Sequence, residues 1–441
     1  MTLGEGDFVT FTCDPLVRCC RWLSTLGIAI AISSTFARPT LAAPPVPEWN
    51  NFYYDAENSD YNPLEHKLSE FNVHQLRFKW SAAVPGGITG MAIDRGVLYA
   101  EGDGAQGNND AVLYAFNATT GAPLWNVTLG DDGFFIPSGS PIAAHHGLVF
   151  AGCNPAPQYG GICAFRYFGG HLMWGDFTGC LGGPPCSLIS GPLFGRGTVF
   201  ESYGIQFGGG NGFAALDPAT GTVLWADGFG NNGLGSNLPI LAAGLVDFGC
   251  NTDNGTFTGV CAVAQAKGQP VWQQQTGTTS DALSSGGGLV FVNFVTAGPG
   301  PEELYALNAA TGAVKWTFGY NAGSPGSLKP AAYANGVVYF KTVDGAVFAL
   351  NAWTGNVLWQ GVSGCAAVSA PVVANGVVYL NCQGRNGPGT LAISARTGAP
   401  LWKRPNNGSA LYAQPIVWNS MVYSTFSVCN GGDDLCVYGL P

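Results

Sequence analysis

The polar side chains that could do chemistry in this chain are few and widely spaced. Its 441 residues include 27 Asp and Glu, 17 Lys and Arg, and 5 His. They form no serine-nucleophile motif, phosphate-binding loop or paired-carboxylate motif. A carboxylate can accept a proton or bind a divalent cation, and a lysine or arginine can hold an anionic ligand. The candidate catalytic acids are Glu101, Asp103 and Asp281, and the candidate ligand-holding groups are Glu201, Lys341 and Arg385.

The elements that must position these groups are revealed by a tryptophan repeat. Eight tryptophans recur 43 to 51 residues apart, namely Trp80, Trp125, Trp174, Trp225, Trp272, Trp316, Trp359 and Trp402. Five of them end the pattern A-x-[DNS]-x-x-T-G-x-x-x-W, as in ALNAATGAVKW. A period of this length is typical of the four-stranded blades of a β-propeller.

The chemistry of the motif indicates a β-hairpin. Alternating apolar residues form one strand, a short polar side chain hydrogen-bonds the turn, and glycine adopts a positive φ before the strand that carries Trp. A second pattern, such as Gly96-Val-Leu-Tyr99, marks an earlier strand and also occurs eight times. The Trp side chains are expected to pack between neighbouring blades.

The repeat predicts an all-β fold, an eight-bladed β-propeller of four-stranded blades. The segment after Trp402 supplies three strands, whereas the strand LRFKW that ends at Trp80 has no hairpin before it. This N-terminal strand should therefore complete the last blade and remove an open sheet edge. Seven blades remain the alternative if one worn repeat is misread. The expected domains are a leader over residues 1–43 and one propeller over residues 44–441.

In such a ring, the loops after each Trp and the loops between second and third strands share one rim. The candidate acids and cations fall on these loops, which makes the rim the predicted ligand site. The alternative for each of them is a solvated loop residue without a functional role, because loops are where charges normally lie.

The N-terminus carries an expected export signal. Arg18 and Arg21 precede an apolar run of about fifteen residues, Trp22 to Phe36, which is shorter than the roughly twenty residues of a membrane span. A small-residue stretch follows, with cleavage expected near Ala42 or Ala43. We therefore expect a secreted protein, extracellular or periplasmic, whose four Asn-x-Ser/Thr sequons could be glycosylated.

The cysteines agree with an oxidising compartment. Ten of the 13 cysteines follow the leader, and they predict disulfides between Cys153 and Cys163, Cys180 and Cys186, Cys250 and Cys261, Cys365 and Cys382, and Cys429 and Cys436. The competing interpretation is a metal site, but no C-x-x-C motif occurs and the histidines do not interleave with the cysteines at ligand spacing.

The charge balance limits the class of partner. A formal net charge of −10 with thinly spread Lys and Arg disfavours nucleic acid or an anionic membrane surface. We expect a monomer that binds either a small-molecule or polymeric alcohol, or a protein ligand.

The repeat resembles the pyrroloquinoline quinone (PQQ) propeller family, which includes quinoprotein alcohol dehydrogenases and a bacterial outer-membrane assembly lipoprotein. The resemblance covers Trp49 to Pro441. The lead-in, which ends in NVHQLRFKW, is most similar to the polyvinyl alcohol dehydrogenase branch. No lipid-attachment cysteine follows the apolar run, so the lipoprotein branch fits less well.

The resemblance implies PQQ over the central channel, Ca²⁺ held by a Glu and an Asn, and an Asp as base. The segment Cys153-Asn-Pro-Ala-Pro157 is similar to the turn that supplies the metal-ligating Asn. Asn154 is thus a candidate cofactor and metal ligand, with Glu201 as a second metal ligand. The alternative is a disulfide-stapled turn, because Cys-Asn recurs at Cys250 and Cys429. Adjacent cysteines occur only in the leader, and the absence of a C-x-x-C-H motif argues against haem.

Two functional hypotheses follow. The first is a secreted quinoprotein-like oxidoreductase that oxidises an alcohol or polyol with PQQ. The second is a non-catalytic binding or scaffold propeller that has lost the cofactor site.

Overall fold

The fold was analysed in a computed structural model, in which residues 46–441 form one compact unit. The structure describes residues 48–441 except 103–109, 132–140, 157–158, 177–185, 206–210, 229–237, 252–256, 277–281, 295–301, 321–328, 343–344, 363–365, 368, 384–388, 406–412 and 430–432. The described residues form β-strands and a single short 3-10 helix, η1 (Val73–Gln75). Among them, no helix has the length and apolar character needed to span a membrane.

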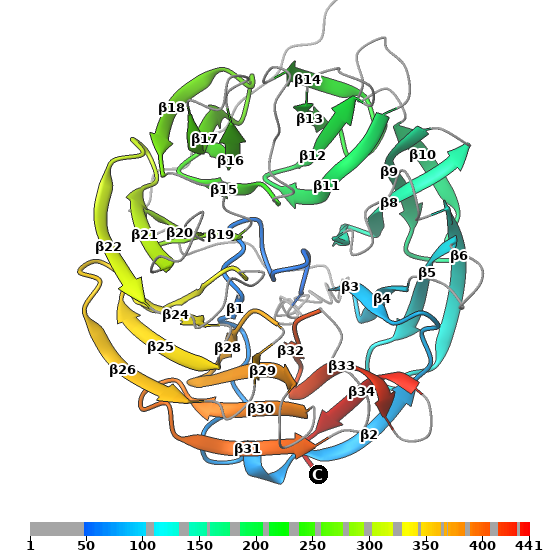
Figure 1. Ribbon diagram of the computed structural model, residues 1–441. Helices are drawn as coiled ribbons and strands as arrows, with labels where there is room; N and C mark the ends of the chain where they lie inside the picture. The colour runs from blue at the N-terminus through cyan, green and yellow to red at the C-terminus, as the bar shows by residue number, and fades with distance from the viewer. Residues whose placement is uncertain are drawn as a thin grey trace, which may run out of the picture. The chain divides into compact units, whose positions relative to one another are not determined.

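Eight four-stranded antiparallel blades surround a central axis, with the first strand of each blade innermost (Figure 1). Blade 1 contains β3 (Ile88–Asp94), β4 (Val97–Gly102), β5 (Asp110–Asn117) and β6 (Pro123–Asp131). Blade 2 contains β7 (Ala143–His145), β8 (Leu148–Ala156), β9 (Tyr159–Arg166) and β10 (Leu172–Asp176). Blade 3 contains β11 (Cys186–Gly195), β12 (Thr198–Ile205), β13 (Asn211–Leu216) and β14 (Val223–Gly228). Blade 4 contains β15 (Ile240–Ala242), β16 (Leu245–Asn251), β17 (Thr258–Ala264) and β18 (Pro270–Gln275).

The second half of the ring repeats this order. Blade 5 contains β19 (Ala282–Gly286), β20 (Leu289–Phe294), β21 (Glu302–Asn308) and β22 (Val314–Tyr320). Blade 6 contains β23 (Ala332–Ala334), β24 (Val337–Lys341), β25 (Ala346–Asn351) and β26 (Val357–Val362). Blade 7 contains β28 (Val372–Ala374), β29 (Val377–Gln383), β30 (Gly389–Ser394) and β31 (Pro400–Pro405), joined by the short β1 (Tyr61–Asn62) and β27 (Ala366–Ala367). Blade 8 contains β32 (Ile416–Trp418), β33 (Met421–Cys429), β34 (Asp433–Gly439) and, from the N-terminal side, β2 (Arg77–Ala82).

Blade 8 confirms the predicted eight-bladed count and its closure. Strand β2 pairs antiparallel with β34, with Trp80 opposite Val437, so a strand from the start of the propeller completes the last sheet. Figure 1 shows β2 as the outer strand beside β34. The closure gives β34 a partner on both sides and completes a four-stranded blade like the others.

The Thr-Gly and Trp positions of the motif meet between blades, which explains why they recur together. The Trp316 indole Nε1 of blade 5 donates to the Ala352 carbonyl of blade 6 at 2.8 Å. A Cβ on Gly355 of blade 6 would lie 2.8 Å from the Trp316 ring, so only glycine fits at this contact. The same contact to the preceding Trp occurs at Gly121, Gly170, Gly221, Gly268, Gly312 and Gly398.

Each blade also carries a row of side chains at matched register. In blade 1 the row is Tyr99 on the second strand, Ala115 on the third and Trp125 on the fourth. The second-strand position is aromatic in seven blades, occupied by Tyr99, Phe150, Phe200, Phe291, Tyr339, Tyr379 and Tyr423. In blade 4 this position is Asp247, which is 0% exposed, in a row with Ala262 and Trp272.

The lead-in before β2 contacts the innermost strand of every blade in turn, which the sequence did not predict. In each blade, the contacted residue lies three positions before the first residue of the second-strand pattern. That first residue is Gly96 in blade 1 and Ser420 in blade 8. The contacted residues are Ile93, Ala144, Phe194, Leu241, Ser285, Tyr333, Val373 and Val417. Residues 49–62, the plug segment, are drawn in blue inside the ring in Figure 1.

Hydrogen bonds hold the plug segment at both ends and in the middle. Trp49 exchanges backbone bonds of 2.9 and 2.7 Å with Ile93, and the Leu241 N–H donates to the Ala56 carbonyl at 2.7 Å. The Asn62 Nδ2 donates to the Val417 carbonyl at 2.7 Å. One segment thus ties all eight blades together at the same height along the axis.

Candidate functional site

The strand order divides the propeller into two ends. The turn end carries the hairpins between first and second strands and between third and fourth strands. The loop end is where second and fourth strands finish. Because the plug segment crosses the channel close to the turn end, a channel ligand would have to enter from the loop end, where the predicted site residues also lie.

Three of the predicted residues are buried in strands rather than solvated in loops. Glu101 lies on β4, Glu201 on β12 and Lys341 on β24, with exposures of 1%, 1% and 9%. Glu101 and Lys341 occupy the same repeat position, five residues after Gly96 and Gly336, in blades 1 and 6. Glu201 is one residue earlier in its repeat, so its side chain points to the other face of its sheet. The alternative of a solvated loop residue is wrong for these three.

Lys341 belongs to a cationic cluster at the loop end between blades 5 and 6. Burial, followed by the nearby Lys329 ammonium, lowers the pKa of Lys341 to about 7. The Asn293 Nδ2 of blade 5 donates to the Lys329 carbonyl at 2.9 Å and so connects the two blades. Asn293 occupies the same repeat position as Lys341. Two ammonium groups this close favour an anion between them.

An acid and three aromatic rings meet between blades 5 and 6, on the opposite face of β24 from Lys341. Glu302, 4% exposed, begins β21, while Tyr320 ends β22 at the same end of blade 5. Burial and the Glu302 carboxylate raise the pKa of the Tyr320 hydroxyl. The Tyr320 ring lies 5.1 Å from that of Phe340, the neighbour of Lys341, and Phe340 stacks on Phe348.

We call Asn293, Lys329 and Lys341 the blade 5/6 cluster. Sequence reasoning found only Lys341. Aligning every blade on its turn glycine could have found Lys329 and Asn293. The residues at their two repeat positions lie at the loop end in the other blades as well.

Asn154 has a different environment. It is 8% exposed and follows Cys153, which forms a disulfide with Cys163 at a Cα–Cα distance of 5.7 Å. A Cβ on Gly130 would lie 2.2 Å from the Asn154 carbonyl, so this residue packs against β6, the outermost strand of blade 1. That position fits the stapled-turn alternative, and ligation by Asn154 stays a prediction.

The remaining predictions were tested only in part. The Cys250–Cys261 disulfide is present, and Cys382 and Cys436 are disulfide-bonded. Asp103, Asp281 and Arg385 lie outside the described residues, as do Cys180 and Cys365. Both disulfides with described pairing join the second and third strands of one blade.

The fit of a quinone cofactor is therefore partial. The lysines of the blade 5/6 cluster match the carboxylates of PQQ. Within the described part of the chain, no three His, Cys, Asp or Glu side chains gather as a metal site. The described residues thus offer cations to the anionic cofactor, whereas they contain no cluster of three such metal-ligating side chains.

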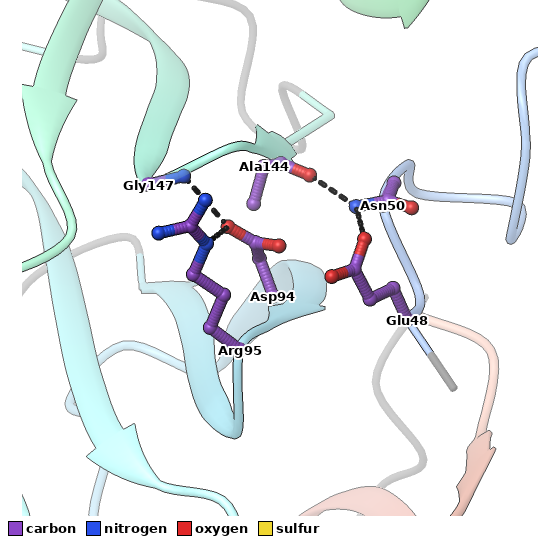
Figure 2. A network of polar contacts seen from close by, with 6 residues as sticks. All are labelled: Glu48, Asn50, Asp94, Arg95, Ala144 and Gly147. Atoms are coloured by element: carbon purple, nitrogen blue, oxygen red, sulfur yellow. Dashed lines mark hydrogen bonds and ion pairs between the residues drawn. The ribbon is translucent and has the colours of Figure 1, made fainter. Parts of the chain in front are cut away.

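A second polar network lies at the turn end of blades 1 and 2 (Figure 2). The Gly147 N–H donates to the Asp94 carboxylate at 3.0 Å, and the Asn50 amide donates to Glu48 at 3.2 Å and to the Ala144 carbonyl at 2.6 Å. Burial, with a further contribution from Glu48, raises the pKa of Asp94 to about 6. This network anchors the start of the plug segment and faces away from the loop end.

Comparison with known proteins agrees with the repeat analysis. Residues 182–317 and 300–436 match the PQQ_2 family model, described as outer membrane protein assembly factor BamB. The chain is 23% identical over 398 residues to tetrathionate hydrolase of Acidithiobacillus ferrooxidans, covering 73% of this chain and 75% of that protein. It is 33% identical over 165 residues to quinoprotein ethanol dehydrogenase of Pseudomonas aeruginosa, covering 31% of this chain and 25% of that protein.

Solved structures support the same fold. A europium-containing methanol dehydrogenase aligns with a TM-score of 0.65 at 16% identity, covering 89% of this chain and 98% of that chain. The relationship to quinoprotein alcohol dehydrogenase-like propellers is shown, whereas the polyvinyl alcohol dehydrogenase branch stays a prediction. Since the family model spans more than half of the sequence, this chain belongs to the PQQ_2 family of β-propellers.

Proposed function

We propose that this protein is a PQQ-dependent oxidoreductase that oxidises an alcohol or polyol outside the cytoplasm. The observation that carries the proposal is the lysine pair of the blade 5/6 cluster, in which Lys341 is buried on a strand that ends at the loop end. The similarity of part of the chain to quinoprotein ethanol dehydrogenase and the disulfides support it.

The residues of this chain would hold the cofactor rather than react themselves. PQQ supplies the two-electron chemistry when bound. Lys341 and Lys329 would bind its carboxylates, and Glu101, at the matching position of blade 1, would accept the alcohol proton. Burial strengthens each of these charged contacts, because little water competes for them.

The test is a thermal-shift titration of the mature protein with PQQ, with and without Ca²⁺, followed by dye reduction with a short-chain alcohol. A micromolar Kd corresponds to about 8 kcal/mol and should raise the Tm at saturating PQQ. Lys341→Gln should weaken PQQ binding about tenfold to a hundredfold, since a charged hydrogen bond contributes about 1.5–3 kcal/mol. Lys315→Gln, on the exposed face of β22, is the matched control.

The competing outcome is the binding propeller. No Tm shift with PQQ and Ca²⁺ together, in a protein with unchanged circular dichroism, would rule out the quinoprotein mechanism. PQQ binding that is insensitive to Lys341→Gln would place the cofactor elsewhere in the ring.

A further inference from the structure

A groove of about 730 Å³ lies at the turn end between blades 6 and 7. Tyr339 and Trp359 of blade 6 form its inner wall, and Asn375 and Arg396 of blade 7 form the opposite side. Phe71, in the lead-in just before η1, closes the third side. The groove is at the opposite end of the propeller from the blade 5/6 cluster.

The aromatic wall is rigid. The Tyr339 hydroxyl and the Trp359 Nε1 both donate to the Ala395 carbonyl, at 3.2 and 2.8 Å. Their ring centroids lie 6.1 Å apart. Because Tyr339 is only 5% exposed, it supports the Trp359 ring from behind, and Trp359 supplies the carbon surface on this side of the groove.

The lead-in wall is equally well held. The Asn375 Nδ2 donates to the Leu68 carbonyl at 2.7 Å, and the Ser394 hydroxyl donates to the Glu70 carboxylate. Leu68 and Val73 on either side are 0% exposed, whereas Phe71 between them is 87% exposed. An anchored turn that presents a phenyl ring to water provides contact area for a ligand at little entropic cost.

The charges around the groove indicate the kind of ligand. Glu70 and Arg396 bring one negative and one positive side chain, so the rim favours neither an anion nor a cation. Together with the Asn375 amide they offer both donors and acceptors. The volume suits several linked units better than one short alcohol, since pockets of 300–1,000 Å³ hold drug-sized ligands.

We propose that this groove binds a segment of a neutral, hydroxyl-rich polymer. The Phe71 and Trp359 rings would cover the carbon–hydrogen faces of the polymer, and Glu70, Asn375 and Arg396 would bond its hydroxyls. The site would keep a polymer on the protein independently of any cofactor.

The test is calorimetric titration without PQQ, using short-chain polyvinyl alcohol and maltoheptaose as probes and ethylene glycol as the monomer control. Binding of at least one polymer is expected, with Phe71→Ala weakening it about tenfold or more, because a buried Phe contributes about 1.5–3 kcal/mol. Arg396→Ala should weaken it further. Phe168→Ala, on blade 2 and 79% exposed, is the matched control and should have no effect.

Three results would overturn the proposal. The first is no binding of either polymer, and the second is equal affinity for the Phe71→Ala and Phe168→Ala variants. The third is a peptide from a phage library that binds the groove in a Phe71-dependent manner while neither polymer does, which would make it a protein-docking site. Because PQQ is absent from the assay, none of these outcomes depends on the proposed oxidoreductase function.

Discussion

Replacing Asp247 with leucine should stabilise the propeller, and most strongly at neutral pH. Asp247 is 0% exposed, and neither carboxylate oxygen has a hydrogen-bond partner among the described residues. Its position is aromatic in the seven other blades, and it shares a row with Ala262 and Trp272. Leucine has nearly the same shape as aspartate, so it removes the polar atoms without overpacking the blade.

The magnitude follows from the cost of burying an unpaired polar group, about 1–3 kcal/mol. Burial raises the pKa of Asp247 well above its ordinary value of 3.8. For an acid with a raised folded pKa, the folded state binds more protons than the unfolded state. Its contribution to stability is therefore complete below pH 3.8 and is lost as the pH rises towards the folded pKa.

The assay is urea unfolding of the wild type, Asp247→Leu and Asp247→Asn between pH 4 and pH 8. Asp247→Leu should increase the free energy of unfolding by about 1–3 kcal/mol at pH 7 and by less at pH 4. Asp247→Asn keeps the shape and the polarity but cannot ionise, so it should flatten the pH dependence with a smaller gain. A leucine variant that is less stable than wild type at every pH would refute the reasoning.

Four further predictions follow from the same contacts. Gly312→Ala should lower the free energy of unfolding in urea by about 1–3 kcal/mol more than Gly288→Ala does. Both glycines have positive φ, but only at Gly312 would an added Cβ meet a Trp ring, at 2.4 Å. Equal losses would contradict this. Asp94→Asn should weaken the fall in Tm between pH 4 and pH 7, since the raised Asp94 pKa of about 6 makes stability decline over that range. PQQ affinity should decrease above pH 7 as Lys341 loses its proton, and Lys341→Gln should remove that decrease. Deleting residues 44–80 should cause aggregation in analytical ultracentrifugation, because blade 8 loses β2 and the blades lose the plug segment; a stable monomer would disprove the closure.

The repeat allowed the fold to be predicted from sequence because its determinants are local. The Thr-Gly turn with the Trp four residues after its glycine encodes one hairpin, and the turn glycine of the second strand encodes another. The repeats of these two patterns specify eight blades. The closure by LRFKW followed from counting strands, since β34 needs a partner for its open edge. The Cys153–Cys163 and Cys250–Cys261 disulfides were predictable because each spans one hairpin.

The candidate site was predictable only in part. Lys341 stood out as a cation on the expected rim, but its neighbour Lys329 and the bridging Asn293 come from a different strand and a different blade. Asn154 was favoured by a short motif, yet its place against β6 depends on how blades 1 and 2 pack.

By itself, the sequence determined the number of blades, the strand order and the ring closure, because hairpins form from residues close together in the chain. Only the tertiary structure decided that residues 49–62 contact all eight inner strands, since each of those bonds joins residues from different repeats. It also decided which charged groups are buried. The burial of Asp247 and the pairing of Lys329 with Lys341 depend on what the neighbouring blade presents, and a periodic pattern carries no information about the partner across a blade interface.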